Sequence, residues 1–367
     1  METAEIQMAA RHKVGGGITV WKETPWPPSR GCWKPFDTVR RQAVFRSRDD
    51  RIFLFQLTTA VSILRPAIPF MATTQWQKTL EIPGRILFSE GNGDLQRLEI
   101  NTAWSTAEVY LHGAHITHFQ KKDQPPVLFL SQLSRFTEGT PIRGGIPVIF
   151  PWFGAREGES AHGFARTQTW DVREVSQSAT GEVLVRLGLP DSPSASLFPK
   201  FTADYWITVG KTLTAQLVIA NVSSGQDFTF EDCLHSYFHV GDIAAVSITG
   251  LKGVDYLDKT ENFSRKTERA EHAKISQETD RIYLNTGGPV EIHDSKLGRR
   301  IRIEKSGGLS TVVWNPWVEK AEQMPDFGGE EFKQMVCVES GNVAENRLTL
   351  PAGKSNTLKV EIGTLPL

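Results

Sequence analysis

Cysteine, net charge and long apolar runs are all scarce in this sequence. Its 367 residues include only three cysteines, whose spacing forms neither a disulfide framework nor a zinc-type pair, so a reducing, cytoplasmic compartment is expected. The formal net charge is -1, whereas nucleic-acid-binding proteins usually carry a strongly basic face. No apolar run reaches the roughly 20 residues that span a bilayer. These absences argue against a nucleic-acid partner and against a membrane protein.

The first 70 residues differ in composition from the rest of the chain. They hold 11 Lys and Arg against 6 Asp and Glu, contain a Trp-Pro-rich patch and lack sustained alternation. We therefore expect residues 1–70 to form a poorly ordered N-terminal extension. The apolar run at 52–64 resembles a signal-peptide core, but about 50 residues precede it, far more than a normal n-region. A mis-assigned start codon, with Met71 as the true start, is a hypothesis that fits this pattern.

From Met71 onward the sequence predicts short strands separated by turns, and no convincing amphipathic helix. So many strands over nearly 300 residues favour an all-β fold, one large antiparallel β-sandwich over residues 71–367, rather than two small domains. A hairpin is predicted around Gly210 and Lys211. The expected strands are 85–90, 95–100, 107–111, 126–130, 146–150, 169–175, 183–189, 205–209, 213–220, 228–238, 245–248, 300–304, 311–314, 335–339 and 358–362.

Residues 141–170 combine glycine, proline, aromatic residues and arginines without strand or helix periodicity. Gly144 and Gly145 would let a ligand approach the main chain closely, and the prolines would stiffen the loop. Arg143 and Arg166 offer planar guanidinium groups that fit phosphate or carboxylate oxygens. The segment therefore predicts a site for a small anion or a phosphosugar. The alternative is a structural loop whose arginines pair with acidic neighbours.

A histidine run, His112, His115 and His118, has spacing that suggests a metal site. On a strand, however, His115 points to the face opposite the other two, so three ligands could converge only after a sharp bend. We therefore expect no metal site here.

Two further segments offer groups for acid–base chemistry. In 231–240, His235 shares a strand face with Cys233 and Tyr237, and it is either a catalytic group or a satisfied core histidine. In 335–341, Glu339 ends an apolar strand, where burial would raise its pKa toward the range of a general base; alternatively it is an edge residue facing water. Asp280 is a third carboxylate, and the Trp314–Trp317 segment is sugar-stacking surface or core.

Six motifs together carry a family resemblance: IRGGIPVIFPWFG, HGFAR, LHSYF, ETDRIY, VVWNPW and MVCVESG. In order and rough spacing they resemble the hexose-6-phosphate mutarotases of the aldose 1-epimerase superfamily, from about Gly84 to the C-terminus. The resemblance implies a galactose-mutarotase-like β-sandwich. It also implies roles for six residues: His235 as the catalytic histidine, Glu339 as the catalytic carboxylate, Arg143 and Arg166 as phosphate ligands, Asp280 as a sugar-hydroxyl ligand, and His162 as a second active-site histidine. Ala161 departs from relatives that have a polar residue there.

The resemblance implies interconversion of the α and β anomers of a hexose 6-phosphate, with glucose 6-phosphate as the first candidate. Glu339 would remove the proton from the C1 hydroxyl and His235 would protonate the ring oxygen, without metal or cofactor. Rival hypotheses are an aldose 1-epimerase for unphosphorylated sugars, a noncatalytic carbohydrate-binding sandwich, and a glycosidase using Glu339 with Asp280. The sequence does not fix the oligomeric state, and a monomer is compatible with it.

Overall fold

The structure is a computed structural model that describes residues 41–46, 52–57 and 75–367. The chain divides into two compact units, Met1–Phe70 and Met71–Leu367. In the first unit, β1 (Arg41–Arg46) pairs antiparallel with β2 (Ile52–Leu57). The other residues of the expected N-terminal extension lie outside the described residues, so its poor order remains a prediction.

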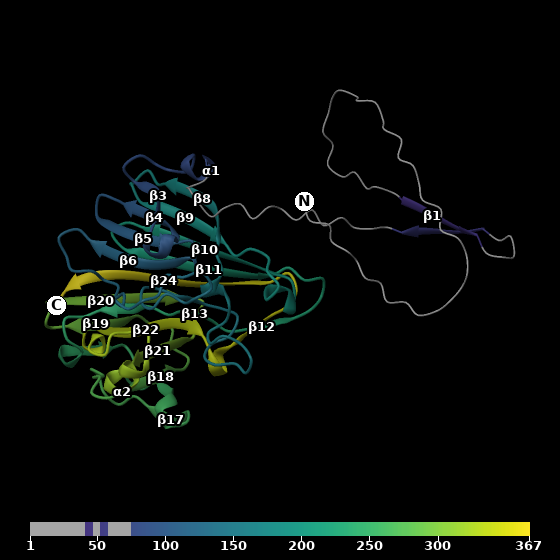
Figure 1. Ribbon diagram of the computed structural model, residues 1–367. Coiled ribbons are helices and arrows are strands. Elements are labelled where there is room, and N and C mark those ends of the chain that lie inside the picture. The colour runs from purple at the N-terminus through teal and green to yellow at the C-terminus, as the bar shows by residue number, and fades with distance from the viewer. Residues whose placement is uncertain (1–40, 47–51, 58–74) are drawn as a thin grey trace. The chain divides into compact units, whose positions relative to one another are not determined.

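The second unit is built from antiparallel strand pairs in three larger sheets and one small one (Figure 1). The four-stranded sheet contains β3 (Ile86–Glu90), β4 (Gln96–Asn101), β5 (Ser105–Tyr110) and β6 (His115–Lys121). One eight-stranded sheet has the order β15 (Val246–Thr249), β19 (Val290–Asp294), β20 (Arg299–Ser306), β24 (Ser355–Pro366), β11 (Leu213–Asn221), β10 (Phe201–Val209), β9 (Val183–Gly188) and β8 (Asp171–Gln177).

The second eight-stranded sheet carries most of the groups expected at the site. Its order is β17 (Ser264–Thr267), β16 (Asp255–Asp258), β18 (Thr279–Tyr283), β21 (Ser310–Asn315), β22 (Met335–Asn342), β13 (Asp232–Leu234) and β7 (Val148–Ile149), and β14 (Tyr237–His239) also pairs with β22. A two-stranded sheet joins β12 (Phe228–Phe230) to β23 (Leu348–Leu350).

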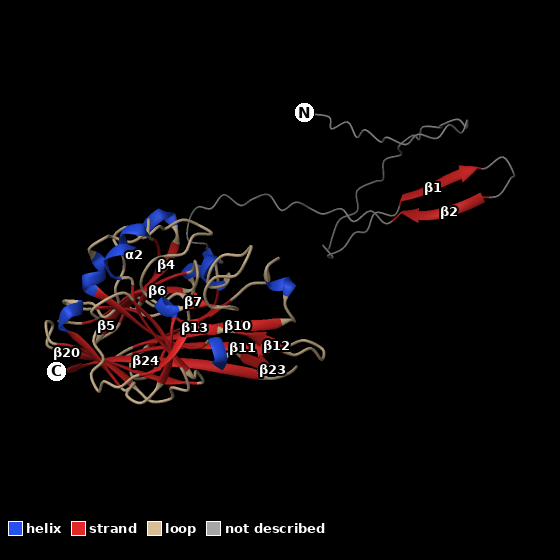
Figure 2. Ribbon diagram, turned by 90° about the horizontal axis from the view of Figure 1, so that it is seen from below, coloured by secondary structure: helices blue, strands red, loops and turns tan. Residues whose placement is uncertain are grey.

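The predicted all-β sandwich is confirmed, and Figure 2 shows that helices are confined to short segments between strands. No convincing amphipathic helix was predicted, and the α-helices that the structure describes are short. Besides 3-10 turns there are α1 (Gln75–Lys78) and the seven-residue α2 (Trp317–Gln323), which begins just after the expected strand at 311–314. Within the described ranges, no helix combines the length and the apolar character that a membrane span would need.

Strands with strict alternation were predicted best. The hairpin around Gly210 and Lys211 is confirmed as β10 paired with β11, and β11 buries every second residue. The strand expected over 228–238 is instead three short strands with different partners: β12 pairs with β23, β13 with β22 and β7, and β14 with β22. The strand expected over 126–130 is wrong, since that segment makes only isolated bridges.

One large apolar cluster joins the three larger sheets, with contributions such as Val109 from β5, Ile207 from β10 and Val338 from β22. Full burial of such a side chain typically contributes about 1.5–3 kcal/mol. On β22, Val336 and Val338 point into this cluster, and the alternating residues Cys337 and Glu339 point away from it. Burial of the two valines in the apolar core thus determines that Glu339 lies on the opposite face of β22.

Candidate functional site

The strand register places the expected site groups in one row across the second eight-stranded sheet. Asp280 on β18 lies opposite Trp314 on β21, Trp314 lies opposite Cys337 on β22, and Cys337 lies opposite Tyr237 on β14. Residues directly opposite each other share a face of the sheet, and Glu339, two residues beyond Cys337, shares it as well. Strand pairing therefore brings together side chains that lie up to about a hundred residues apart in sequence.

A cavity of about 320 Å³ opens over this row. Its volume lies at the small end of the range for small-molecule sites, about 300–1,000 Å³. All six residues expected at the site line it: Arg143, His162, Arg166, His235, Asp280 and Glu339. Other lining residues, which the sequence did not assign to the site, include Phe153, Tyr237, Lys259 and Lys320.

His235 and Glu339 form the central pair of the cavity. The Nδ1 atom of His235 lies 3.3 Å from Oε1 of Glu339, and Glu339 is only 1% exposed. The thiol of Cys233 donates to the other carboxylate oxygen, Oε2, over 3.5 Å. His235 occupies the gap between β13 and β14, so the break in the predicted strand is what places its ring beside β22. Glu339 is therefore no water-facing edge residue.

Burial shifts the pKa values of this pair in opposite directions. Loss of solvation, followed by repulsion from Asp280, raises the pKa of Glu339 well above its ordinary value. Loss of solvation, followed by the positive charges of His162, Arg166 and Arg143, lowers the pKa of His235 well below its ordinary value. Both shifts favour the uncharged forms. The pair therefore favours the state in which Glu339 carries a proton and His235 is neutral.

Tyr237 supports the histidine from the neighbouring strand. Its ring stacks on His235 with centroids 4.8 Å apart and planes 9° from parallel, and it meets Trp314 edge-on. Its hydroxyl accepts a hydrogen bond from Nη1 of Arg143 over 3.1 Å. Stacking and hydrogen bonding thus restrict the imidazole to one orientation toward Glu339.

Arg143 and Arg166, the two arginines expected at the site, have different partners. Nε and Nη2 of Arg143 both donate to Oδ2 of Asp326, at 3.2 and 3.1 Å, so the alternative of an acidic neighbour holds for this residue. Arg166 donates from Nη2 to the carbonyl of Ala161, while its buried Nε has no partner in the described part of the chain. Burial and the nearby Arg143 lower the pKa of Arg166 to about 10, so it still carries its charge near neutrality. Arg166 is the freer of the two for an anionic ligand.

His162 and Lys259 complete the cavity wall. The His162 ring meets Phe153 edge-on at 4.8 Å and approaches His235 at 5.6 Å. Nζ of Lys259 lies 2.9 Å from the carboxylate of Asp280, an ion pair that no local sequence pattern predicts. Asp280 therefore offers any sugar hydroxyl a carboxylate whose charge is already partly balanced.

Gly144 and Gly145 have a different purpose from the one expected. Neither lines the cavity, and both have positive φ values, 114° and 61°. A Cβ on Gly144 would lie 2.5 Å from the carbonyl of Phe129, and one on Gly145 would lie 2.2 Å from that of Ile116. The two glycines therefore allow close packing of the chain against neighbouring backbone. They do not serve to let a ligand approach the main chain.

The three histidines of the 112–118 run bond to three different oxygens: the carbonyls of Thr140 and Gly144 and the hydroxyl of Thr106. A group with metal-ligand geometry occurs elsewhere, where His235 Nδ1, Cys337 Sγ and a Glu339 oxygen lie within 4.8 Å of one another. Burial raises the pKa of the Cys337 thiol well above its ordinary value, and Arg143 and Arg166 add positive charge nearby. These groups suit a cation poorly, because a metal needs the thiolate.

Comparison with known proteins agrees with this geometry. The family model described as aldose 1-epimerase matches residues 96–363. A protein of Cenchrus ciliaris is 32% identical over 270 residues, covering 71% of this chain and 82% of its own, and one of Escherichia coli K12 is 34% identical over 244 residues, covering 66% and 81%. Both are named "Putative glucose-6-phosphate 1-epimerase".

A solved structure from Salmonella typhimurium, described as "a putative mutarotase (YeaD)", superposes with a TM-score of 0.72 at 29% identity. It covers 78% of this chain and 96% of its own. The residues matched by the family model, 96–363, include all six residues expected at the site. The chain belongs to the aldose 1-epimerase family.

Proposed function

We propose that this protein interconverts the α and β anomers of a hexose 6-phosphate, with glucose 6-phosphate as its first candidate substrate. The observation that carries the proposal is the His235–Glu339 pair, 3.3 Å apart at the base of a cavity that also holds Arg166 without a carboxylate partner. Family membership supports the reaction, and the names of the two relatives above support the phosphorylated substrate.

In this mechanism the proton of the pair moves from Glu339 to His235 when the substrate binds; Glu339 then takes the proton from the C1 hydroxyl while His235 gives its proton to the ring oxygen. The C1–O5 bond breaks, the carbonyl end rotates, and closure on the other face returns both protons. The number of protons on the pair is unchanged at the end of each half-reaction. A positioned acid or base typically contributes about 10² to 10⁴ in rate, so two suffice for a reaction that already proceeds slowly in water.

The phosphate is the group that the arginines would orient. Arg166 has an unpaired, buried Nε, and Arg143, although it bonds to Asp326, keeps its guanidinium on the cavity wall. Contacts to a phosphate far from C1 would hold the ring in the geometry that the acid and base require. Asp280 would accept a hydrogen bond from a sugar hydroxyl, and His162 would line the ring's other side.

The second candidate, an aldose 1-epimerase for unphosphorylated sugars, would use the same pair. It gives no reason for a buried arginine that lacks a carboxylate partner. Burying an unpaired charge costs free energy, which an anionic substrate would offset.

Magnetisation-exchange NMR between the α and β anomeric protons tests the proposal directly. We expect the protein to accelerate exchange for glucose 6-phosphate and not for glucose. Equal acceleration of both sugars would favour the unphosphorylated substrate. No acceleration of either by a folded sample would contradict the enzymatic function and leave a carbohydrate-binding module.

The cellular setting is part of the same proposal. Cys233 and Cys337 are free, buried thiols, which suits a reducing cytoplasm, where hexose phosphates are also found. The small-molecule substrate is the only partner that the proposal requires.

A further inference from the structure

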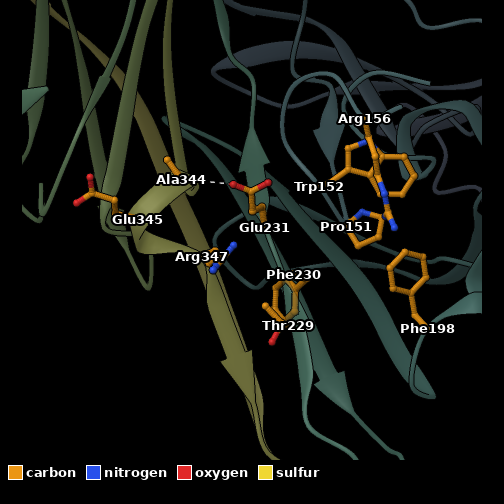
Figure 3. A pocket seen from close by; sticks show the side chains of 10 residues that line it. All are labelled: Pro151, Trp152, Arg156, Phe198, Thr229, Phe230, Glu231, Ala344, Glu345 and Arg347. Atoms are coloured by element: carbon orange, nitrogen blue, oxygen red, sulfur yellow. Dashed lines mark hydrogen bonds between the residues drawn. The ribbon is translucent and has the colours of Figure 1, made fainter. Parts of the chain in front are cut away.

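A second, larger cavity of about 730 Å³ lies on another side of the segment that lines the catalytic cavity. Phe153, Gly154 and Ala155 line the first cavity, whereas Pro151, Trp152 and Arg156 line the second (Figure 3). Neither the mechanism above nor the family comparison gives this second cavity a role.

Arg156 is held in place by aromatic rings. Its guanidinium carbon lies 4.8 Å from the centre of the Trp152 ring and 5.8 Å from that of Phe198, and those two rings stack on each other at 6.3 Å. A guanidinium stacked flat on a ring keeps its N–H edges free to donate. No carboxylate pairs with Arg156 among the residues that the structure describes.

Arg347 approaches the cavity from the opposite wall, as Figure 3 shows. Its side chain also has no acidic partner within the described ranges. The two carboxylates of the cavity are already engaged: Glu231 accepts from the backbone N–H groups of Phe153 and Ala344, at 2.9 and 2.7 Å, and Glu345 pairs with Arg265. The cavity therefore offers two guanidinium groups and no uncommitted carboxylate.

The rest of the lining includes the apolar residues Pro151, Phe198 and Phe230 beside Thr229 and the backbone-bonded Glu231. Guanidinium groups fit phosphate oxygens, and aromatic edges suit the apolar face of a sugar ring. We propose that this cavity is a second binding site for a phosphate group, one carried by a sugar phosphate, with Arg156 and Arg347 as its ligands.

The proposal goes beyond the catalytic function and does not depend on it, because the two sites share no ligand. They do share a wall. Glu231 holds the N–H of Phe153, and the Phe153 ring contacts His162 in the catalytic cavity. Occupants of the two cavities would therefore contact opposite sides of one anchored segment.

The test uses ¹⁹F NMR of the full chain with 5-fluorotryptophan in place of its 10 tryptophans. Trp152 reports the second cavity and Trp314 the catalytic one, and the substitutions Trp152→Phe and Trp314→Phe assign their signals. The probes are glucose 6-phosphate, inorganic phosphate and glucose. We expect glucose 6-phosphate to shift the Trp152 signal saturably, and the double substitution Arg156→Gln with Arg347→Gln to weaken that binding at least about tenfold, because two charge-assisted contacts are lost.

Arg269→Gln is the matched control, since Arg269 is an exposed arginine away from both cavities, and it should leave both signals unchanged. Tighter binding of glucose 6-phosphate than of inorganic phosphate supports a sugar phosphate; similar affinities support the phosphate group alone as the ligand. Equal binding of glucose, no shift at Trp152, or a shift that survives the double substitution would each overturn the proposal. A shift at Trp314 is read separately, so failure of the catalytic proposal remains distinguishable.

Discussion

The two cavities beside segment 151–156 differ in a way that volume alone does not reveal. The larger one, about 730 Å³, holds two arginines, one of them stacked on aromatic rings, and its carboxylates are bound to backbone or to arginine. The smaller one, about 320 Å³, holds a buried carboxylate in contact with a buried imidazole. A buried acid and a buried base that can exchange a proton lie in contact only in the smaller, catalytic cavity. The contact between two buried ionisable side chains, and not the volume, therefore marks the catalytic cavity.

The largest expected effect is a fall in kcat when the carboxylate of the catalytic cavity is replaced, compared with no change when a carboxylate of the second cavity is replaced. Glu339→Gln keeps the shape of the side chain but removes the base, so we expect kcat to fall by about 10² to 10⁴. The melting temperature should not fall, because a neutral amide replaces a buried carboxyl that already favours its neutral form. Glu345→Gln, in the other cavity, is the matched control and should leave kcat unchanged. Near-normal turnover in Glu339→Gln would remove the proposed base.

The arginines give the next effect in size. Arg166→Gln should raise KM for glucose 6-phosphate by roughly 10- to 100-fold, the value of one or two charge-assisted contacts. Arg143→Gln should act in the same direction but also free Asp326, its present partner. Arg269→Gln again serves as control. Steady-state kinetics with phosphorylated and free sugar make the comparison, and equal changes for both would show that neither arginine binds phosphate.

Substitution of Glu231 tests whether its hydrogen bonds stabilise the 151–156 segment between the two cavities. Its carboxylate accepts from Phe153 and Ala344, which lie far apart in sequence, and an amide can accept only one of these bonds. Glu231→Gln should lower the free energy of unfolding by about 1–3 kcal/mol. Denaturant titration measures this, with Glu345→Gln as control. An unchanged free energy of unfolding would mean that the segment needs no anchor.

The sequence predicted features that depend on neighbouring residues, and did not predict contacts between residues far apart in the chain. Strict alternation predicted β10 and β11, because burial with a period of two is a local signal. The motifs also selected six residues that line one cavity, although their roles stay predictions. The ion pairs Arg143–Asp326 and Lys259–Asp280 had no such signal, since they join separate segments.

The second cavity could not be predicted for the same reason. Arg156, Phe198, Glu231 and Arg347 meet only because β12 pairs with β23 and the 151–156 segment packs against Phe198. The single strand expected over 228–238 hid this arrangement. Its interruption at Glu231 and at His235 places one residue at each cavity, and the change of partner strand from β23 to β22 is a tertiary feature without a local signal.

The smallest expected effect concerns pH and requires no substitution. If one proton resides on the His235–Glu339 pair, activity is lost when the pair gains a second proton at low pH and when it loses its proton at high pH. The lowered pKa of His235 sets the acid limb of kcat/KM below pH 6.5, and the raised pKa of Glu339 sets the alkaline limb well above pH 4.5. NMR of the His235 ring nitrogens should find it still neutral at pH 6.5. An imidazole already half protonated at that pH would show that burial does not control the protonation of the pair.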